Sequence, residues 1–346
     1  MSELQLGLLA IGLIVVAGVF AYNRHQERTA RRAAQDNFQS GHADVLLEPR
    51  VGRIDPAAAE MQQGAARTAA PPAAALPDAR IDYVVELSFA TPLAASVLVE
   101  NWKANEHLHA ARAILACRGG GSAWRRLAAG DGAAVDCLHA GLQLVTREGA
   151  VNETQLIEFR TAVETLAAAT GASVSAPEIK QAVDTARELD RFCGDSDIQV
   201  VFHVTAPAGG SLPGSRIRAV AETSGLMLEE DGRFVLRDGA GQVLYALCSR
   251  DGSRFEAAGI DDAVLPGISL ALDVPRVPDL RREFLSMAEF AGQLADALGG
   301  SLVDDNANPL DDRALAAIGV QLDSVRGAFE AKGIATGSAQ ALRLFS

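Results

Sequence analysis

Histidine and cysteine side chains that could bind a metal ion or act as nucleophiles gather between residues 107 and 139. Zinc sites take these residue types, usually in short paired spacings such as C-x-x-C or H-x-x-x-H. No standard zinc spacing is present, so the sequence predicts ordinary core or surface roles and no metal site. A hydrolase that uses this cluster is kept as a third and weaker function. The members are His107, His109, Cys117, Cys137 and His139.

Three other motifs also favour a non-enzymatic reading. Gly119–Ser122 reads GGGS without a following Gly-Lys-Ser/Thr, which predicts a turn and not a phosphate loop. The acidic pairs Asp304-Asp305 and Asp311-Asp312 fall where a turn and a helix start are expected, so capping explains them. No serine has the context of a nucleophile elbow. We therefore expect no enzyme, no catalytic residue and no cofactor.

The N-terminus carries a long apolar run. Leu4–Tyr22 contains no charged residue, and about 20 apolar residues in a helix cross the hydrocarbon core of a bilayer. Four arginines follow between residues 24 and 32, so the positive-inside rule places the N-terminus in the periplasm and everything after Tyr22 in the cytoplasm. A cleaved signal peptide has its cations before the apolar run. Residues 1–23 are thus predicted to be a single-pass inner-membrane anchor.

Charge narrows the choice of partners. The net charge is −13, and the chain after residue 32 carries −15. Nucleic-acid binding needs a basic face, so a nucleic-acid partner is not expected. The four cysteines (117, 137, 193 and 248) lack regular spacing and are expected to be reduced in the cytoplasm.

Residues 24–80 are expected to connect the anchor to the folded part. Their first portion is basic and touches the membrane. Residues 48–80 are rich in Ala, Pro, Gly and Gln, include AAPPAAALPDA, and lack helical or strand periodicity. This composition predicts a disordered linker.

The folded part reads as two α+β units, 81–192 and 198–332, which resemble each other. Each begins with a β-rich run, at Ile81 and Ile198, offset by 117 residues. AGLQLV (140–145) resembles PGISLA (266–271), and TGASV (170–174) resembles LGGSL (298–302), at offsets of 126 and 128. The near-constant offset predicts a degenerate internal repeat, with chance similarity as the alternative.

The sequence of the second unit predicts an antiparallel sheet that has helices on one face and is open on the other. Hairpin strands flank Asp231-Gly232, a long helix ends at Gly299, and a final helix begins at Asp311 or Asp312. Predicted strands are 198–205, 242–249, 268–274 and 301–304, and predicted helices are 213–224, 279–298 and 312–330.

Three segments of the second unit resemble the family of the bacterial cell-division protein ZipA. They are PGISLALDVP (266–275), FLSMAEFAGQLADALGGSLVDDN (284–306) and PLDDRALAAIGVQLDSV (309–325). The anchor, the Pro/Ala linker and the C-terminal α+β domain also agree with that family. The extra unit at 81–192 departs from its single-domain pattern, so no role is carried over to it.

The resemblance implies that the second unit binds the C-terminal tail of FtsZ on the exposed face of its sheet. Strand alternation places Val200, Phe202 and Val204 toward the helices. Large apolar groove residues of the family are replaced here by Asp231, Arg250 and Ala271, so charge pairing must supply more of the affinity. The expected partner-binding residues are Val201, His203, Asp231, Cys248, Arg250, Ser269 and Ala271.

The sequence therefore predicts a non-enzymatic tether that anchors FtsZ filaments to the inner membrane and bundles them. The alternative is an anchored scaffold for another divisome or envelope protein, in which the two units pack on each other and cover the groove. Residues 333–346 form a C-terminal tail without an assigned role.

Overall fold

The computed structural model describes residues 75–109, 112–128, 133–208 and 210–346, without the side chains of residues 104–109. The predicted anchor and most of the linker lie outside the described residues. Within the described ranges, no helix is both long enough and apolar enough to cross a bilayer.

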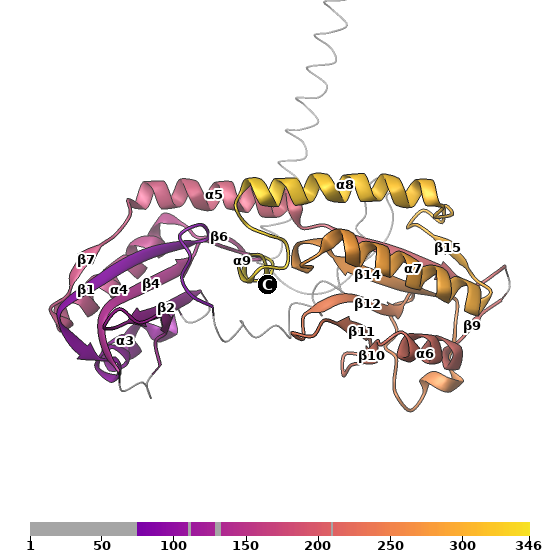
Figure 1. Ribbon diagram of the computed structural model, residues 1–346, viewed down its shortest axis with the longest axis horizontal. Coiled ribbons are helices and arrows are strands. Elements are labelled where there is room, and N and C mark those ends of the chain that lie inside the picture. The colour runs from indigo at the N-terminus through magenta and orange to yellow at the C-terminus, as the bar shows by residue number, and fades with distance from the viewer. Residues whose placement is uncertain (1–74, 110–111, 129–132, 209) are drawn as a thin grey trace, which may run out of the picture. The chain divides into compact units, whose positions relative to one another are not determined.

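The first α+β unit contains an antiparallel sheet in the order β3-β2-β4-β1-β7. Figure 1 draws it in indigo and magenta. A separate small hairpin, β5-β6, follows β4. The elements are β1 (Asp82–Ala94), α3 (Ala95–His109), β2 (Ala113–Arg118), β3 (Arg125–Arg126), β4 (Ala134–Gln143), β5 (Val145–Thr146), β6 (Gly149–Ala150), α4 (Glu153–Thr170), β7 (Ser173–Ser175) and α5 (Ile179–Ser196).

Helices α3 and α4 cover one face of this sheet, and α5 packs against α4. Helix α4 has an apolar stripe, because Leu156, Phe159, Val163 and Leu166 recur at steps of three or four residues and are all buried in the core. Asn152 accepts a hydrogen bond from the backbone N–H of Gln155, and the Gln155 side chain accepts one from the Asn152 N–H. This capping box fixes where α4 begins.

The second α+β unit has a sheet in the order β10-β11-β12-β14-β8-β15, so the predicted antiparallel α+β architecture is confirmed. The same unit also contains a separate two-stranded sheet, β13-β9. The elements are β8 (Gln199–Thr205), β9 (Leu212–Pro213), α6 (Gly214–Thr223), β10 (Met227–Leu228), β11 (Phe234–Arg237), β12 (Val243–Ser249), η1 (Ile260–Asp262), β13 (Val264–Leu265), β14 (Gly267–Asp273), η2 (Val274–Arg276), α7 (Leu280–Leu298), β15 (Ser301–Val303), α8 (Asp312–Ala331) and α9 (Ala339–Leu344).

Helix α7 packs across β8, β12 and β14, and α8 packs on α7 (Figure 1). Helix ends follow the predicted signals. Gly299 ends α7 in the left-handed conformation, with φ 64°. Asp311 begins α8 by accepting a hydrogen bond from the Ala314 backbone N–H. The helix-facing residues Val200, Phe202 and Val204 lie in the core, as predicted.

The two units share the strand order β7-β1-β4 and β15-β8-β14. Leu87 pairs with Val174, and Val204 pairs with Leu302, which agrees with the predicted offsets of 117 and 128. The strands β4 and β14 correspond at a different offset from the one predicted. Val85 pairs with Ala140, and its counterpart Phe202 pairs with Leu270. Ala140 therefore corresponds to Leu270 at an offset of 130, and the predicted offset of 126 was wrong by four residues.

The chain connection next to the central strands also differs between the units. In the first unit the edge strand β3 follows β2, whereas in the second unit the edge strand β10 and its neighbour β11 precede β12. A common origin of the two units therefore stays a prediction that this topology only partly matches.

The C-terminal segment completes the core of the first unit. Ala341, Leu344 and Phe345, in and after α9, are buried among the residues of that core. Phe329 of α8 packs edge-on against Phe192 of α5, with ring centroids 4.9 Å apart. Residues 333–346, to which the sequence assigned no role, thus pack into the core of the first unit, which also contains residues of β1.

Candidate functional site

The helix-free face of the second sheet, called here the outer face, contains the residues predicted to bind a partner. Strand pairing arranges five of the seven in two lateral rows. Cys248, Ser269 and His203 lie opposite one another on β12, β14 and β8. Ala271 and Val201 form the next row, and Ala246 extends it on β12. Side chains two residues apart on one strand share a face, so both rows point away from α7.

The outer face is less open than the sequence predicted. His203, Cys248, Ser269 and Ala271 are buried, whereas Val201, Asp231 and Arg250 are half-buried. Three of the four buried residues have small side chains. The centre of the face is therefore a floor of mostly small side chains, and the half-buried Val201, Asp231 and Arg250 form its rim.

His203 joins two residues of this face. Its Nδ1 lies 2.8 Å from the Ser269 hydroxyl, and its Nε2 lies 2.7 Å from the Asp305 carboxylate. A Ser-His-Asp arrangement is typical of acyl transfer only when the serine is accessible and the acid is buried. Here Ser269 is buried while the Asp305 side chain is 73% exposed. The arrangement is thus suited to holding His203 in place.

Asp305 corrects a prediction, because its side chain does not act as a simple cap. Asp304 does have the expected turn role, since it accepts backbone N–H groups of Asn306 and Asn308. Its neighbour instead reaches across to β8 and contacts His203. The contact spans 102 residues of sequence, so no local pattern could indicate it.

Asp231 is already paired within the protein. Arg233 donates hydrogen bonds from its Nε (2.8 Å) and Nη2 to the Asp231 carboxylate. A basic group of a partner would therefore have to compete with Arg233. Burial raises the pKa of the nearby Cys248 thiol to about 11, with Arg233 acting weakly in the opposite direction. This thiol stays protonated at neutral pH.

Arg250 is the charged residue of this face that is best placed to meet a partner. Within the described residues it makes no salt bridge, although its backbone N–H donates to the Gly267 carbonyl. Its side chain lies over Gly267, where a β-carbon would come within 3.2 Å of the Arg250 Cδ. Glycine at this position leaves room for the Arg250 side chain to lie against β14.

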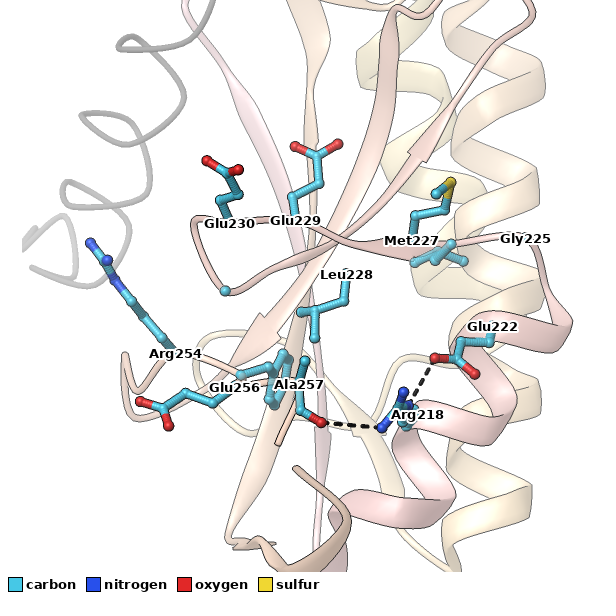
Figure 2. A pocket seen from close by; sticks show the side chains of 13 residues that line it. Arg218, Glu222, Gly225, Met227, Leu228, Glu229, Glu230, Arg254, Glu256 and Ala257 are labelled. Carbon is cyan, nitrogen blue, oxygen red and sulfur yellow. Dashed lines mark hydrogen bonds and ion pairs between the residues drawn. The ribbon is translucent and has the colours of Figure 1, made fainter. Parts of the chain in front are cut away.

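A hollow of about 1060 Å³ opens beside the edge strand β10, called here the β10 pocket. Figure 2 shows Met227 and Leu228 among its lining residues, with Arg218 bonded to Glu222 and to the Ala257 carbonyl. Leu226 and Phe255 also line it. Four glutamates and two arginines surround this apolar floor, so the β10 pocket is a second place where a segment could dock.

The histidine and cysteine residues of the first unit separate in the structure. Cys117 lies in the core, and the side chains of His107 and His109 lie outside the described part. Cys137 and His139 do come together, joined by Glu86 from β1. The Gly119–Ser122 segment forms the predicted turn, since the Ser122 N–H donates to the Gly119 carbonyl.

Comparison with known protein families assigns the second unit. Residues 198–321 match the family described as ZipA, C-terminal FtsZ-binding domain. The matched range runs from β8 into α8 and contains all seven predicted partner-binding residues. It does not extend to residues 81–192, so the predicted second copy gains no support from it. Residues 198–321 are thus similar to the FtsZ-binding domain of ZipA.

Proposed function

We propose that this chain binds the C-terminal tail of FtsZ through the outer face of its second unit, without catalysing a reaction. The observation that carries the proposal is the family match over residues 198–321. The outer face of this unit supplies the two rows of side chains and the Arg250 guanidinium, which makes no ion pair with any other described residue. A short peptide can lie over such rows, with a carboxylate toward Arg250.

In this proposal the tail contacts the rim first. Val201 and Arg250 are half-buried and accessible, whereas Ser269 and Ala271 form the floor beneath the peptide. Small floor residues bury less apolar area than large ones. We therefore expect a dissociation constant in the micromolar range, which corresponds to about −8 kcal/mol.

We further propose that Leu4–Tyr22 anchors the chain in the inner membrane, with both folded units in the cytoplasm. The linker would let the units reach a filament near the membrane. A filament offers many tails, so several anchored copies bind it with avidity and can bundle it. A reporter fused after Ser346 tests this topology, and reporter activity in the periplasm would exclude it.

Calorimetric titration of the full-length chain with a peptide of the FtsZ C-terminus from the same organism tests tail binding. A scrambled peptide of the same composition is the control. We expect one site per chain for the native peptide and no measurable heat for the scrambled one. Equal binding of both peptides, or none at about 1 mM, would falsify the proposal.

A second candidate is an anchored scaffold for another divisome or envelope protein, in which the outer face is covered. The burial of His203, Cys248, Ser269 and Ala271 favours it. The two candidates differ in the titration, because a covered face rejects the native peptide. They also differ in cells, where crosslinking from position 201 reaches FtsZ only if the first candidate is right.

A further inference from the structure

We propose that Glu86, Cys137 and His139 form a binding site for a zinc ion on the first unit. Cys137 and His139 are two residues apart on β4, so their side chains share a face of the sheet. Glu86 lies directly opposite His139 on β1. Their ligand atoms all lie within 4.8 Å of one another.

The spacing of these atoms agrees with tetrahedral coordination. The Cys137 Sγ lies 3.6 Å from Glu86 Oε1, and the His139 Nε2 lies 3.4 Å from Glu86 Oε2. Zinc binds sulfur at about 2.3 Å and nitrogen or oxygen at about 2.0–2.2 Å. At a tetrahedral angle these lengths place sulfur about 3.6 Å from oxygen and nitrogen about 3.4 Å from oxygen. The two contacts involve different oxygens of Glu86, so this carboxylate has to turn for one oxygen to meet both Cys137 and His139 at an ion.

The chemical nature of the three groups selects the metal. A thiolate and an imidazole suit zinc and cobalt, whereas magnesium and calcium prefer oxygen ligands alone. Three protein ligands leave a fourth position for water. The Glu86 side chain is 47% exposed, so an ion can reach the site from solvent.

Neighbouring side chains hold the histidine in place. The Trp124 ring stacks on the His139 ring, with centroids 3.8 Å apart and planes 23° apart. The Arg118 guanidinium lies 5.0 Å from the centre of the same Trp124 ring. This stack keeps the His139 Nε2 turned toward Glu86, and a fixed ligand orientation favours metal binding.

Binding of the ion requires the Cys137 proton to leave. Burial and the carboxylate of Glu86 raise the pKa of the Cys137 thiol, which donates a hydrogen bond to Glu86 without the ion. When zinc binds, the S–H bond breaks, a zinc–sulfur bond forms and the proton passes to water. Strand pairing between β1 and β4 places Glu86 opposite His139 and Ser88 opposite Cys137.

The test uses the full-length chain, reduced and freed of metal with a chelator. Zinc affinity is measured by competition with a coloured chelator, and cobalt is added separately to record its visible spectrum. We expect one zinc ion per chain and a cobalt spectrum with a thiolate charge-transfer band. Glu86→Gln, Cys137→Ser and His139→Ala should each weaken zinc binding at least tenfold.

Cys193→Ser is the matched control, because it removes a thiol of α5 outside the site and should leave zinc affinity unchanged. Thermal unfolding of each variant shows whether it is folded. Zinc binding that Cys137→Ser leaves unchanged, or a cobalt spectrum without the thiolate band, overturns the proposal. Neither result bears on FtsZ binding, which is measured separately.

Discussion

Arg343, in the last turn of the chain, donates two hydrogen bonds to the carboxylate of Asp82, at the start of β1. The Nη1–Oδ2 distance is 2.9 Å and the Nη2–Oδ1 distance is 2.6 Å, and both side chains are buried. Gln143 of β4 donates to the Arg343 carbonyl at 2.8 Å. These hydrogen bonds connect α9 to the start of β1 and to the end of β4.

Replacing Arg343 with methionine should destabilise the protein strongly. The change keeps much of the apolar stem but leaves the Asp82 carboxylate buried without its partner. Breaking one side of a buried ion pair costs about 3–5 kcal/mol, and we expect a fall of that size in the free energy of unfolding. Urea unfolding followed by circular dichroism measures it.

Arg187→Met is the control, because Arg187 pairs with Asp184 at 3.4 Å on the exposed surface of α5. Such surface pairs contribute at most about 1 kcal/mol. If both variants lose the same stability, the Asp82–Arg343 pair is not the buried link described here.

Deleting residues 339–346 should loosen the first unit more than the second. The deletion removes Ala341, Leu344 and Phe345 from the first core, which also contains Phe329. Hydrogen exchange should then speed up in β1 and β4 and change little in β14. Equal acceleration in both sheets would contradict this asymmetry. The isolated fragment 198–346 would expose Phe345 for the same reason, so binding experiments are better made with the full chain.

Local signals in the sequence were enough for most helices and strands. The apolar stripe of α7 and its glycine end at Gly299 are encoded within a few residues, as are the alternation in β8 and the Asp311 cap. Strand alternation also put Val201, His203, Ser269 and Ala271 on one face. Periodicity reports such features directly because they repeat every two or every 3.6 residues.

What the sequence did not reveal are contacts between distant segments. Glu86 lies 51 residues before Cys137, Asp305 lies 102 residues after His203, and Arg343 lies 261 residues after Asp82. Each depends on how strands pair and where a chain end returns, and no local pattern carries that information. The Asp231–Arg233 pair was within reach, since two residues of opposite charge flank the predicted Gly232 turn.

The stability of the protein should depend on the protonation of Asp273. Burial raises the pKa of its carboxyl from 3.8 to about 6, although Arg147 and Arg276 act in the opposite direction. These two guanidinium groups lie 3.6 and 3.9 Å from Asp273 Oδ2. Nearby Asp197 raises the pKa further.

A group whose pKa is higher in the folded state binds its proton more tightly there. Its contribution to stability is therefore complete below about pH 4 and is lost as pH rises toward about 6. The loss is at most about 3 kcal/mol, and less because a quarter of the side chain is exposed.

Asp273→Asn isolates this contribution from that of the other carboxyl groups. The unfolding free energy of the wild type should fall relative to that of the variant as the pH rises from about 4 to about 6. Urea unfolding at a series of pH values measures that difference. A difference that stays constant over this range would mean that Asp273 titrates normally.

Charge reversal at Arg250 should separate the outer face from the β10 pocket as the place where a peptide binds. Arg250→Glu places a negative charge where we expect a carboxylate of the FtsZ tail. It should weaken the peptide at least tenfold, which is about 1.4 kcal/mol. Binding to wild type should also weaken with added salt, since the contact lies at the rim.

Two control variants complete the experiment. Arg282→Glu makes the same charge change on α7, where the side chain is 77% exposed, and should leave peptide affinity unchanged. Met227→Ser alters the most exposed apolar side chain of the β10 pocket, and it too should have no effect. If Met227→Ser weakens binding while Arg250→Glu does not, the peptide occupies the β10 pocket, because only a residue in contact with the peptide can change its affinity without changing the fold.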